Sequence, residues 1–347
     1  MSWFKRKSPP AEFLLINAYS TLISPPPPPF AHNQRDRTDP ELTPHLGGFI
    51  QYVLGTQPQM TATLYSVMRH LERVQHQFSL EVADTDLAAF LAWAGQANAV
   101  YFYPDGSVRD PAGRVLVSPD SGQLDPAAQV PYPADALARK NRSTAQLQRL
   151  GIQVPVSLPP VVGEGEVRWR TPQEVARRTV ALAAVAVLAE SRAEGEPLAH
   201  SVLDRNLPGC AAFLSPAEQA YLAEQQPSEQ QNVNFGWRYE SLSLLNWALG
   251  LMDELPFPDQ ICDVPLTASL ARETANKFDS PQLQPAPDLL DALDLHFRLH
   301  WAVVDARINN REAPQGIIPG VILERHYALN WLTRFEDNDW DEVDTPT

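Results

Sequence analysis

The hydrophobic pattern of this 347-residue chain changes once, at a proline-rich stretch near the middle. Upstream, segments with alternate apolar residues are interleaved with segments of helical spacing, which favours a sheet packed against helices. Downstream, only helical spacing remains, which favours a bundle. The stretch VPVSLPPVVGEGEV (154–167) continues neither pattern, because proline lacks the N–H that helices and sheets use. We therefore predict an α+β protein and place the domain junction there.

The first part of the chain, 1–117, is predicted to be a small α/β sandwich domain with a sheet covered by helices on one side. Helical spacing marks 61–74 and 85–98, and alternation of apolar and polar residues marks 77–82. The segment GFIQYVL (48–54) is also interpreted as a strand. Strands that alternate with helices in this way are typical of a layered α/β unit.

Two proline-rich segments are expected to be irregular. Consecutive prolines at 25–29 force an extended segment without backbone donors, which suits either a stiff linker or the aromatic groove of another protein. Residues 118–165 are predicted to be a proline-rich linker that contains one helix, near 134–150.

The remainder, 166–347, is predicted to be an all-α helical bundle domain. Thr171 stands at an N-cap position, Pro172 follows at the first helical position, and Glu174 lies three residues after the cap. This is the capping-box arrangement. A second Ser-Pro start opens SPAEQAYLAEQQ (215–226), and three further helices are predicted at 237–255, 288–307 and 320–337.

Composition restricts the partners. Lys and Arg total 27 against 42 Asp and Glu, so the formal charge of −15 repels phosphate backbones and argues against nucleic acid. The basic cluster ARKNRSTAQLQR (138–149) is interpreted as a solvated helix face, with a local binding patch as the alternative. A membrane partner is not expected, because no window approaches the roughly 18 apolar residues of a span. Cys210 and Cys262 fit no disulfide or metal pattern, which favours a cytoplasmic protein.

The segment DLLDALDLHFRLHWAVVDAR (288–307) carries many ionisable groups between long apolar side chains. On a helix turning about 100° per residue, these groups fall into two seams that are separated by apolar faces. A helix that is apolar on two faces is normally central to a bundle. One seam contains Asp291, Asp294, Arg298 and Asp305 with Trp301 beside them, and the other contains His296, His300 and Arg307.

Two charges on the helix at 237–255 also point toward packed surface. The same projection places Glu240 on the side of the helix that carries Trp247, and it places Arg238 on a side that carries other apolar residues. Because a buried unpaired charge is very costly, both need partners on neighbouring helices. The candidate partners are Asp291, Asp294, Arg298, Glu324, Arg325 and His326.

Two interpretations of these groups remain open. In the first, they form buried ion pairs that fix helix register, and Asp294 with Arg298 already has the favourable i,i+4 order. The second is general acid/base or metal-assisted chemistry in one pocket, with candidate catalytic residues Glu240, Asp294, His300, Glu324 and His326.

A zinc-binding pair on the same helix is a separate, weaker reading. His296 and His300 have the i,i+4 spacing of such a pair, but the glutamate of an H-E-x-x-H motif and a third ligand are missing from the sequence pattern. We expect no metal and no other cofactor.

Six motifs occur in order in the second half: RTPQEVARR (170–178), LSPAEQAYL (214–222), WRYESLSLLNWALG (237–250), LLDALDLHFRLHWAVVDAR (289–307), ERHYALNWL (324–332) and WDEVDT (340–345). Together they resemble the bacterial DUF4272 family, a domain of unknown function, from 167 to 347. The ending DTPT departs from the Thr-Asp-Thr close that the resemblance implies. The resemblance implies a domain and no catalytic residue. Its motif positions are Arg238, Glu240, Asp291, Asp294, His300, Trp301, Glu324, Arg325, His326, Asn330, Trp331 and Asp341.

The function expected from these features is binding. A strongly acidic chain without a recognisable catalytic motif fits a cytoplasmic bacterial adaptor or immunity-type protein with a protein partner. The alternative is a hydrolase-like enzyme with an acid/base or metal-assisted site in the helical domain. The remaining polar positions are assigned to binding or to a buried network: Arg238, Asp291, Arg298, Trp301, Arg325, Asn330, Trp331 and Asp341.

Overall fold

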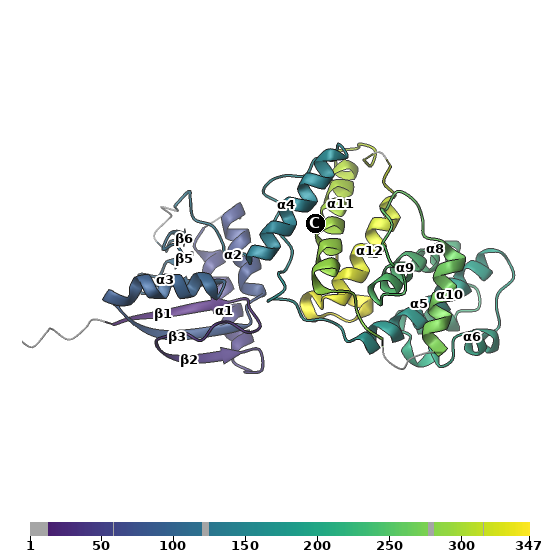
Figure 1. Ribbon diagram of the computed structural model, residues 1–347, viewed down its shortest axis with the longest axis horizontal. Coiled ribbons are helices and arrows are strands. Elements are labelled where there is room, and N and C mark those ends of the chain that lie inside the picture. Colours follow the sequence, from purple (N-terminus) through teal and green to yellow (C-terminus); the bar gives the residue numbers. More distant parts are fainter. Residues whose placement is uncertain (1–12, 58, 120–124, 277–280, 315) are drawn as a thin grey trace, which may run out of the picture. The chain divides into compact units, whose positions relative to one another are not determined.

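The computed structural model describes residues 13–57, 59–119, 125–276, 281–314 and 316–347. Internal contacts divide the chain into two compact units, one ending at Ala134 and the next beginning at Asp135. The first unit contains a sheet with helices, and the described residues of the second unit contain helices without strands, which confirms the predicted fold class (Figure 1). None of the helices in the described part of the chain is long and apolar enough to cross a membrane.

The first unit is built on an antiparallel sheet whose strands are β1 (Phe13–Ser20), β2 (Ala31–Asp36), β3 (His76–Ala83), β4 (Ala99–Phe102), β5 (Val108–Arg109) and β6 (Val115–Val117). Their order is β2-β3-β1-β4-β5-β6. The central strand β1 pairs with β3 from Phe13↔Ala83 to Ser20↔His76, and with β4 on its other side. The helices of this unit are α1 (Leu42–Gly55), α2 (Ala62–Glu72), the 3-10 turn η1 (Asp84–Asp86) and α3 (Leu87–Gln96).

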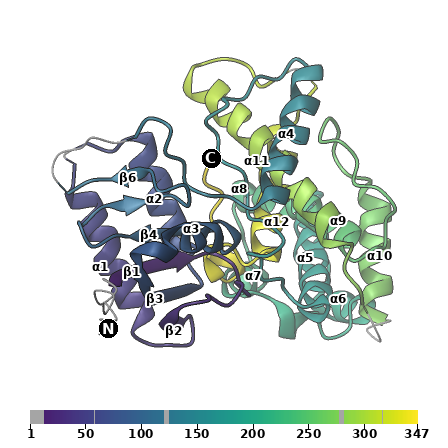
Figure 2. The ribbon, with the colours of Figure 1, turned by 60° about the vertical axis from the view of Figure 1, so that its left-hand side comes forward.

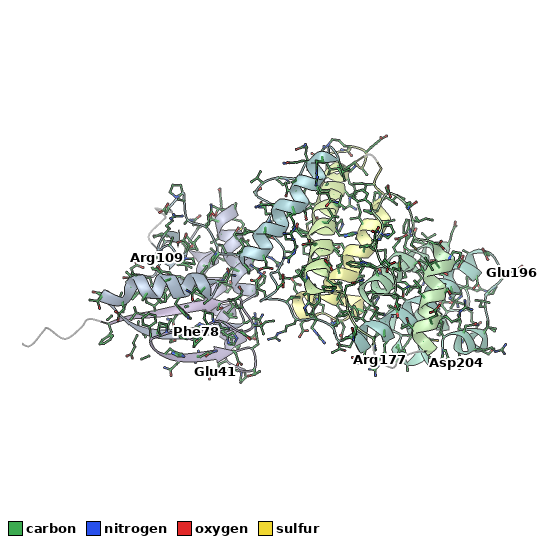
Figure 3. All side chains as sticks on the ribbon, viewed as in Figure 1. Glu41, Phe78, Arg109, Arg177, Glu196 and Asp204 are labelled. Atoms are coloured by element: carbon green, nitrogen blue, oxygen red, sulfur yellow. The ribbon has the colours of Figure 1, made fainter. Side chains whose placement is uncertain are left out.

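Helices cover both faces of this sheet, so the expectation of a one-sided covering is wrong. The period-two alternation of β1 sends Ile16 and Tyr19 to opposite faces. Tyr19 belongs to a core that includes side chains of α1 and α2, whereas Ile16 belongs to a core that includes side chains of α3. Phe78 of β3, labelled in Figure 3, meets Trp93 of α3 edge to face with ring centroids 5.2 Å apart.

Residues 48–54 are helical, so the prediction of a strand there is also wrong. They form the C-terminal half of α1, whose buried residues Leu42, Leu46, Phe49 and Val53 recur every three or four positions. Within 48–54 only Phe49 and Val53 belong to this set, and two residues are too few to reveal the helical spacing. Phe49 stacks on Tyr19 with centroids 4.6 Å apart and so anchors α1 to the sheet.

The helices of the second unit are α4 (Ala134–Arg149), α5 (Pro172–Ala193), α6 (His200–Asn206), α7 (Pro216–Ala223), α8 (Glu229–Gly236), α9 (Arg238–Ala248), α10 (Val264–Asn276), α11 (Ala286–Ile308) and α12 (Pro319–Leu332). Three short 3-10 turns accompany them: η2 (Cys210–Phe213), η3 (Phe335–Asp337) and η4 (Trp340–Glu342). Apart from its first residue, α4 belongs by its contacts to this helical unit, although the sequence analysis assigned it to a linker.

The capping box of α5 is present as predicted. The Thr171 hydroxyl accepts the N–H of Glu174, and the Glu174 carboxylate accepts the N–H of Thr171. Ser215 and Glu218 repeat the arrangement at the start of α7. Helix α5 contacts α8, α9 and α10, while α12 contacts both α9 and α11 (Figure 2). The helices that carry the predicted polar residues, α9, α11 and α12, therefore share one core.

Candidate functional site

Arg325 of α12 holds Glu240 of α9 in a buried ion pair. The Nε and Nη2 atoms of Arg325 both donate to Oε2 of Glu240, at 3.2 and 3.1 Å. The other carboxylate oxygen accepts the backbone N–H of Cys262 at 2.6 Å. Glu240 is 2% exposed and Arg325 is 1% exposed. Both oxygens of this candidate catalytic carboxylate are therefore engaged inside the fold.

Asp294 and Arg298 form the i,i+4 pair that the sequence predicted, and both are fully buried. The guanidinium donates to both carboxylate oxygens, at 2.8 and 2.7 Å. It also donates to the carbonyl of Pro159 at 3.1 Å. This bidentate geometry is the strong form of the interaction and fixes both side chains.

Arg238 of α9 pairs with Glu324 of α12. Its Nη1 atom lies 3.1 Å from Oε2 and 3.3 Å from Oε1 of the carboxylate. The Ser241 hydroxyl donates to the same Oε2 at 2.7 Å. The guanidinium of Arg238 also lies over the ring of Tyr327 at 4.9 Å. All three candidate catalytic carboxylates thus have an arginine partner.

The two candidate catalytic histidines bond to each other. Nδ1 of His300 and Nδ1 of His326 lie 2.9 Å apart, so one imidazole donates and the other accepts. Burial, followed by the charge of Arg307, lowers the pKa of His300 to about 4. Burial lowers the pKa of His326 well below its ordinary value. Both rings are therefore neutral near pH 7.

His296 and His300 do not act as a pair in this structure. Nδ1 of His296 donates to the carbonyl of Ala292 at 2.8 Å, while Nδ1 of His300 is occupied by His326. Within the described ranges, His, Cys, Asp and Glu side chains form no group of three or more that could hold a metal ion.

Asp291 connects α11 to the basic helix α4. One oxygen of Asp291 accepts from Nε of Arg139 at 3.0 Å and from Nη2 of Arg142 at 2.6 Å. Arg139 also lies within ion-pair distance of Asp135 and Glu164 and is 1% exposed. The interpretation of the basic cluster as a solvated face is therefore wrong for Arg139. The carboxylate of Asp291 is visible in the sequence, but that it faces α4 and pairs with Arg139 is visible only in the structure.

The remaining predicted residues tie the C-terminal segment to the bundle. Asp341 accepts the backbone N–H of Ala217 at 2.9 Å, at the start of α7, where the helix dipole favours a carboxylate. Nδ2 of Asn330 donates to the carbonyl of Asp344 at 2.8 Å. Trp331 packs against the ring of Trp340, with centroids 5.4 Å apart, whereas Trp301 is half-buried beside another apolar cluster.

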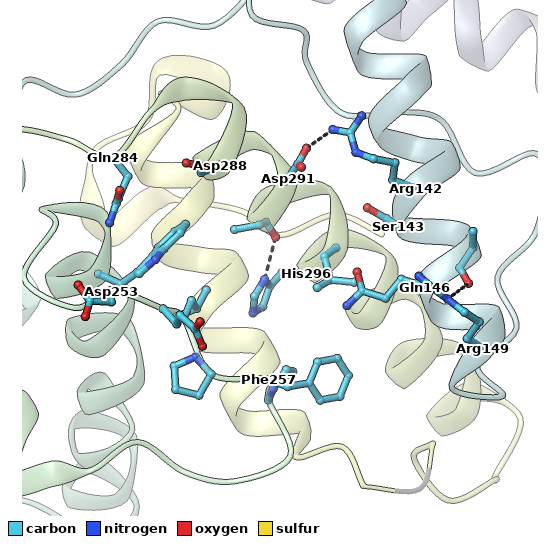
Figure 4. A pocket seen from close by; sticks show the side chains of 18 of the residues that line it. Arg142, Ser143, Gln146, Arg149, Asp253, Phe257, Gln284, Asp288, Asp291 and His296 are labelled. Carbon is cyan, nitrogen blue, oxygen red and sulfur yellow. Dashed lines mark hydrogen bonds and ion pairs between the residues drawn. The ribbon is translucent and has the colours of Figure 1, made fainter.

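A hollow in the helical unit, which no sequence pattern predicted, is lined in part by Asp291 and His296 of α11. It is an open groove of about 1350 Å³ between α4, the loop at 253–258 and α11 (Figure 4). The loop that lines one side of the groove follows the end of α9 at Ala248, where Gly250 has a φ of 69°. A glycine just past a helix end is a stop signal, and it would have excluded the predicted continuation to residue 255.

His296 lies in this groove and has an unusual environment. The side chain is 2% exposed, and Nε2 has no hydrogen-bond partner among the described residues. Burial, followed by the charge of Arg325, lowers the pKa of His296 to about 3. Because Nδ1 carries the proton that is donated to Ala292, Nε2 of the neutral ring is an acceptor.

Comparison with known proteins identifies only the helical part. The model of the family described as Domain of unknown function (DUF4272) matches residues 139–343. No curated protein and no solved structure gives a significant match to the chain. The match includes α4 from Arg139 onward, so the family's domain begins earlier than the resemblance by motifs indicated. Because the matched residues make up more than half of the sequence, the chain belongs to the DUF4272 family.

Proposed function

We propose that this protein binds another protein through its helical unit, as an adaptor or immunity-type protein in the bacterial cytoplasm. The observation that carries the proposal is that Glu240, Asp294 and Glu324 are each paired with an arginine. A general base needs a free lone pair within hydrogen-bond reach of a substrate proton. These carboxylates instead direct lone pairs to arginines, within α11 for Asp294 and between α9 and α12 for Glu240 and Glu324, which supports a structural role.

The cysteines support the cytoplasmic location. Cys210 and Cys262 are both free thiols. Burial raises the pKa of both thiols, that of Cys262 to about 12, which keeps them protonated and unreactive.

The test is recovery and reconstitution of a complex. The full-length chain, expressed with a tag in its own host, should retain one partner through size-exclusion chromatography. The purified pair should then bind with defined stoichiometry in isothermal titration calorimetry. Turnover of an ester, amide or phosphoester substrate that disappears in Glu324→Gln, while the melting temperature stays at the parent value, would contradict the proposal. Glu196→Gln, an exposed substitution in the helical unit that is labelled in Figure 3, is the matched control.

A further inference from the structure

The polar groups that line the groove beside His296 fall into an acidic and a basic side. Asp253 and Gln284 lie on one side, and Gln146 and Arg149 of α4 lie on the other (Figure 4). Arg142 is already paired with Asp291 across the groove. The charge available to a ligand on the α4 side is therefore reduced to that of Arg149.

The acidic side carries carboxylates that the fold does not use. Asp253, Glu254 and Asp288 are exposed, line the groove, and form no ion pair with an arginine or lysine of the described chain. This contrasts with Glu240 and Asp294, each of which accepts two hydrogen bonds from one arginine. Exposed carboxylates alone are ordinary solvated surface.

His296 makes this place different from ordinary surface. A buried polar atom without a partner costs free energy, and such atoms are rare in folded proteins. Nε2 of His296 is one of several such atoms among the described residues and the one that lies at this groove, where Figure 4 shows its ring near Gln146 and Phe257. The pKa of the ring keeps it neutral, so Nε2 accepts and cannot donate.

The groove therefore offers acceptors for which the fold supplies no donors. Asp253, Glu254, Asp288 and Nε2 of His296 all accept hydrogen bonds, and three of them are anionic. The matching chemistry is a cation that carries several donors, which is a guanidinium or an ammonium group. The size of the groove, about 1350 Å³, exceeds the roughly 300 to 1000 Å³ of ordinary small-molecule pockets.

We propose that this groove binds an extended segment of a partner polypeptide whose lysine or arginine side chain enters at the acidic side, while a donor of the same segment reaches Nε2 of His296. The inference rests on the proposed function and names its site and partner chemistry. Because Nε2 is sealed from water, the donor reaches it when side chains that line the groove move aside. The backbone of the groove stays in place, since Asp291 ties α11 to α4.

Selection from a displayed library of short randomised peptides on the full-length chain tests the inference. Peptides that bind should be enriched in lysine and arginine, and should bind less tightly as salt is added. His296→Leu and Asp288→Asn should each weaken the best peptide roughly tenfold, the effect of one lost charge-assisted hydrogen bond. Asp253→Asn, which is exposed and leaves the fold intact, supplies the same readout if His296→Leu misfolds. The matched controls are His200→Leu and Glu196→Gln, both exposed and outside the groove.

Several results would overturn the inference. One is a library that yields no binder sensitive to Asp288→Asn or Asp253→Asn, and another is a set of binders without basic residues. Arginine amide that binds as tightly as the peptides would make the groove a small-molecule site. If the natural partner binds the parent and Asp253→Asn equally, the proposed function stands and only this inference fails. If no protein partner exists and turnover is found, the proposed function itself fails.

Discussion

Two polar regions of the helical unit share α11 and differ in whether their hydrogen-bond acceptors are occupied. Asp294 and His296 are two residues apart, and both are buried. Asp294 accepts two hydrogen bonds from Arg298, whereas Nε2 of His296 accepts no hydrogen bond from the described chain. Removing one member of a buried pair therefore strands a charge inside the helical unit, whereas the unpartnered Nε2 of His296 carries a free-energy cost that the described fold does not offset.

This contrast separates two kinds of experiment. Variants in the paired network should change the free energy of unfolding, because removing one partner strands a buried charge. Variants of the exposed carboxylates that line the groove, Asp253, Glu254 and Asp288, should change binding and leave the free energy of unfolding nearly unchanged, because solvent already satisfies those groups. Unfolding of the helical unit can be followed by tryptophan fluorescence, since most of the tryptophans lie in it.

The largest effect is expected at the fully buried pair. Asp294→Ala should lower the free energy of unfolding by about 4 kcal/mol, because Arg298 would keep its charge without a carboxylate in the core. Urea unfolding measures the loss. The double variant Asp294→Leu/Arg298→Met, which removes both charges, should recover most of it. A single variant as stable as the parent would mean that water reaches Arg298.

Glu240→Ala should have the next largest effect, about 3 kcal/mol, since it strands Arg325 and also removes the acceptor for the N–H of Cys262. Thermal and urea unfolding both report it. Glu240→Gln retains an acceptor for Cys262 and should lose less. An unchanged melting temperature in Glu240→Ala would show that Arg325 is held mainly by the carbonyl of Pro256, to which it donates at 2.6 Å.

His296 should make stability depend on pH with a predictable sign. Its pKa is about 3 in the fold against an ordinary 6.5, so below pH 6.5 the unfolded chain binds a proton that the folded chain does not. The free energy of unfolding should therefore fall with falling pH in this window, by up to about 1.4 kcal/mol per pH unit from this residue. Above pH 6.5 its contribution is constant. His296→Leu should flatten the profile by that amount between the two pKa values, and an unaltered slope would place a proton on the ring in the folded state.

The smallest effect on stability is expected for the exposed carboxylates that line the groove. Asp288→Asn should change the free energy of unfolding by less than about 0.5 kcal/mol, because the side chain is exposed and unpaired. The same variant should weaken binding of a basic peptide. A loss of stability comparable to that in Glu240→Ala would erase the distinction between the two regions.

The paired region could be predicted from sequence to a large extent. Helical spacing identified α9, α11 and α12, and the cost of burying Glu240 and Asp294 without partners required arginines nearby. The i,i+4 spacing alone identified Arg298 as the partner of Asp294. For Glu240, several candidates remained until the crossing of α9 and α12 selected Arg325.

The groove could not be predicted in the same way. Its walls come from α4, α11 and a loop, and no periodicity relates Gln146 to Phe257 or Asp253. Placing α4 in a linker concealed the contact of Arg139 with Asp291. The unpartnered Nε2 of His296 is a property of packing, because the sequence shows only a histidine in an apolar helix.

Asp135 has a practical consequence for anyone who isolates the helical unit. Its carboxylate accepts from Nη1 of Arg139 at 3.3 Å and from the backbone N–H of Glu164 at 2.9 Å. A recombinant fragment cut to the family match would begin at Arg139 and lose the first turn of α4 together with this carboxylate. Arg139 would then lose one of its anionic partners, and the N–H of Glu164 would lose its acceptor. A fragment that starts before Ala134 keeps α4 complete, and with it the wall of the groove.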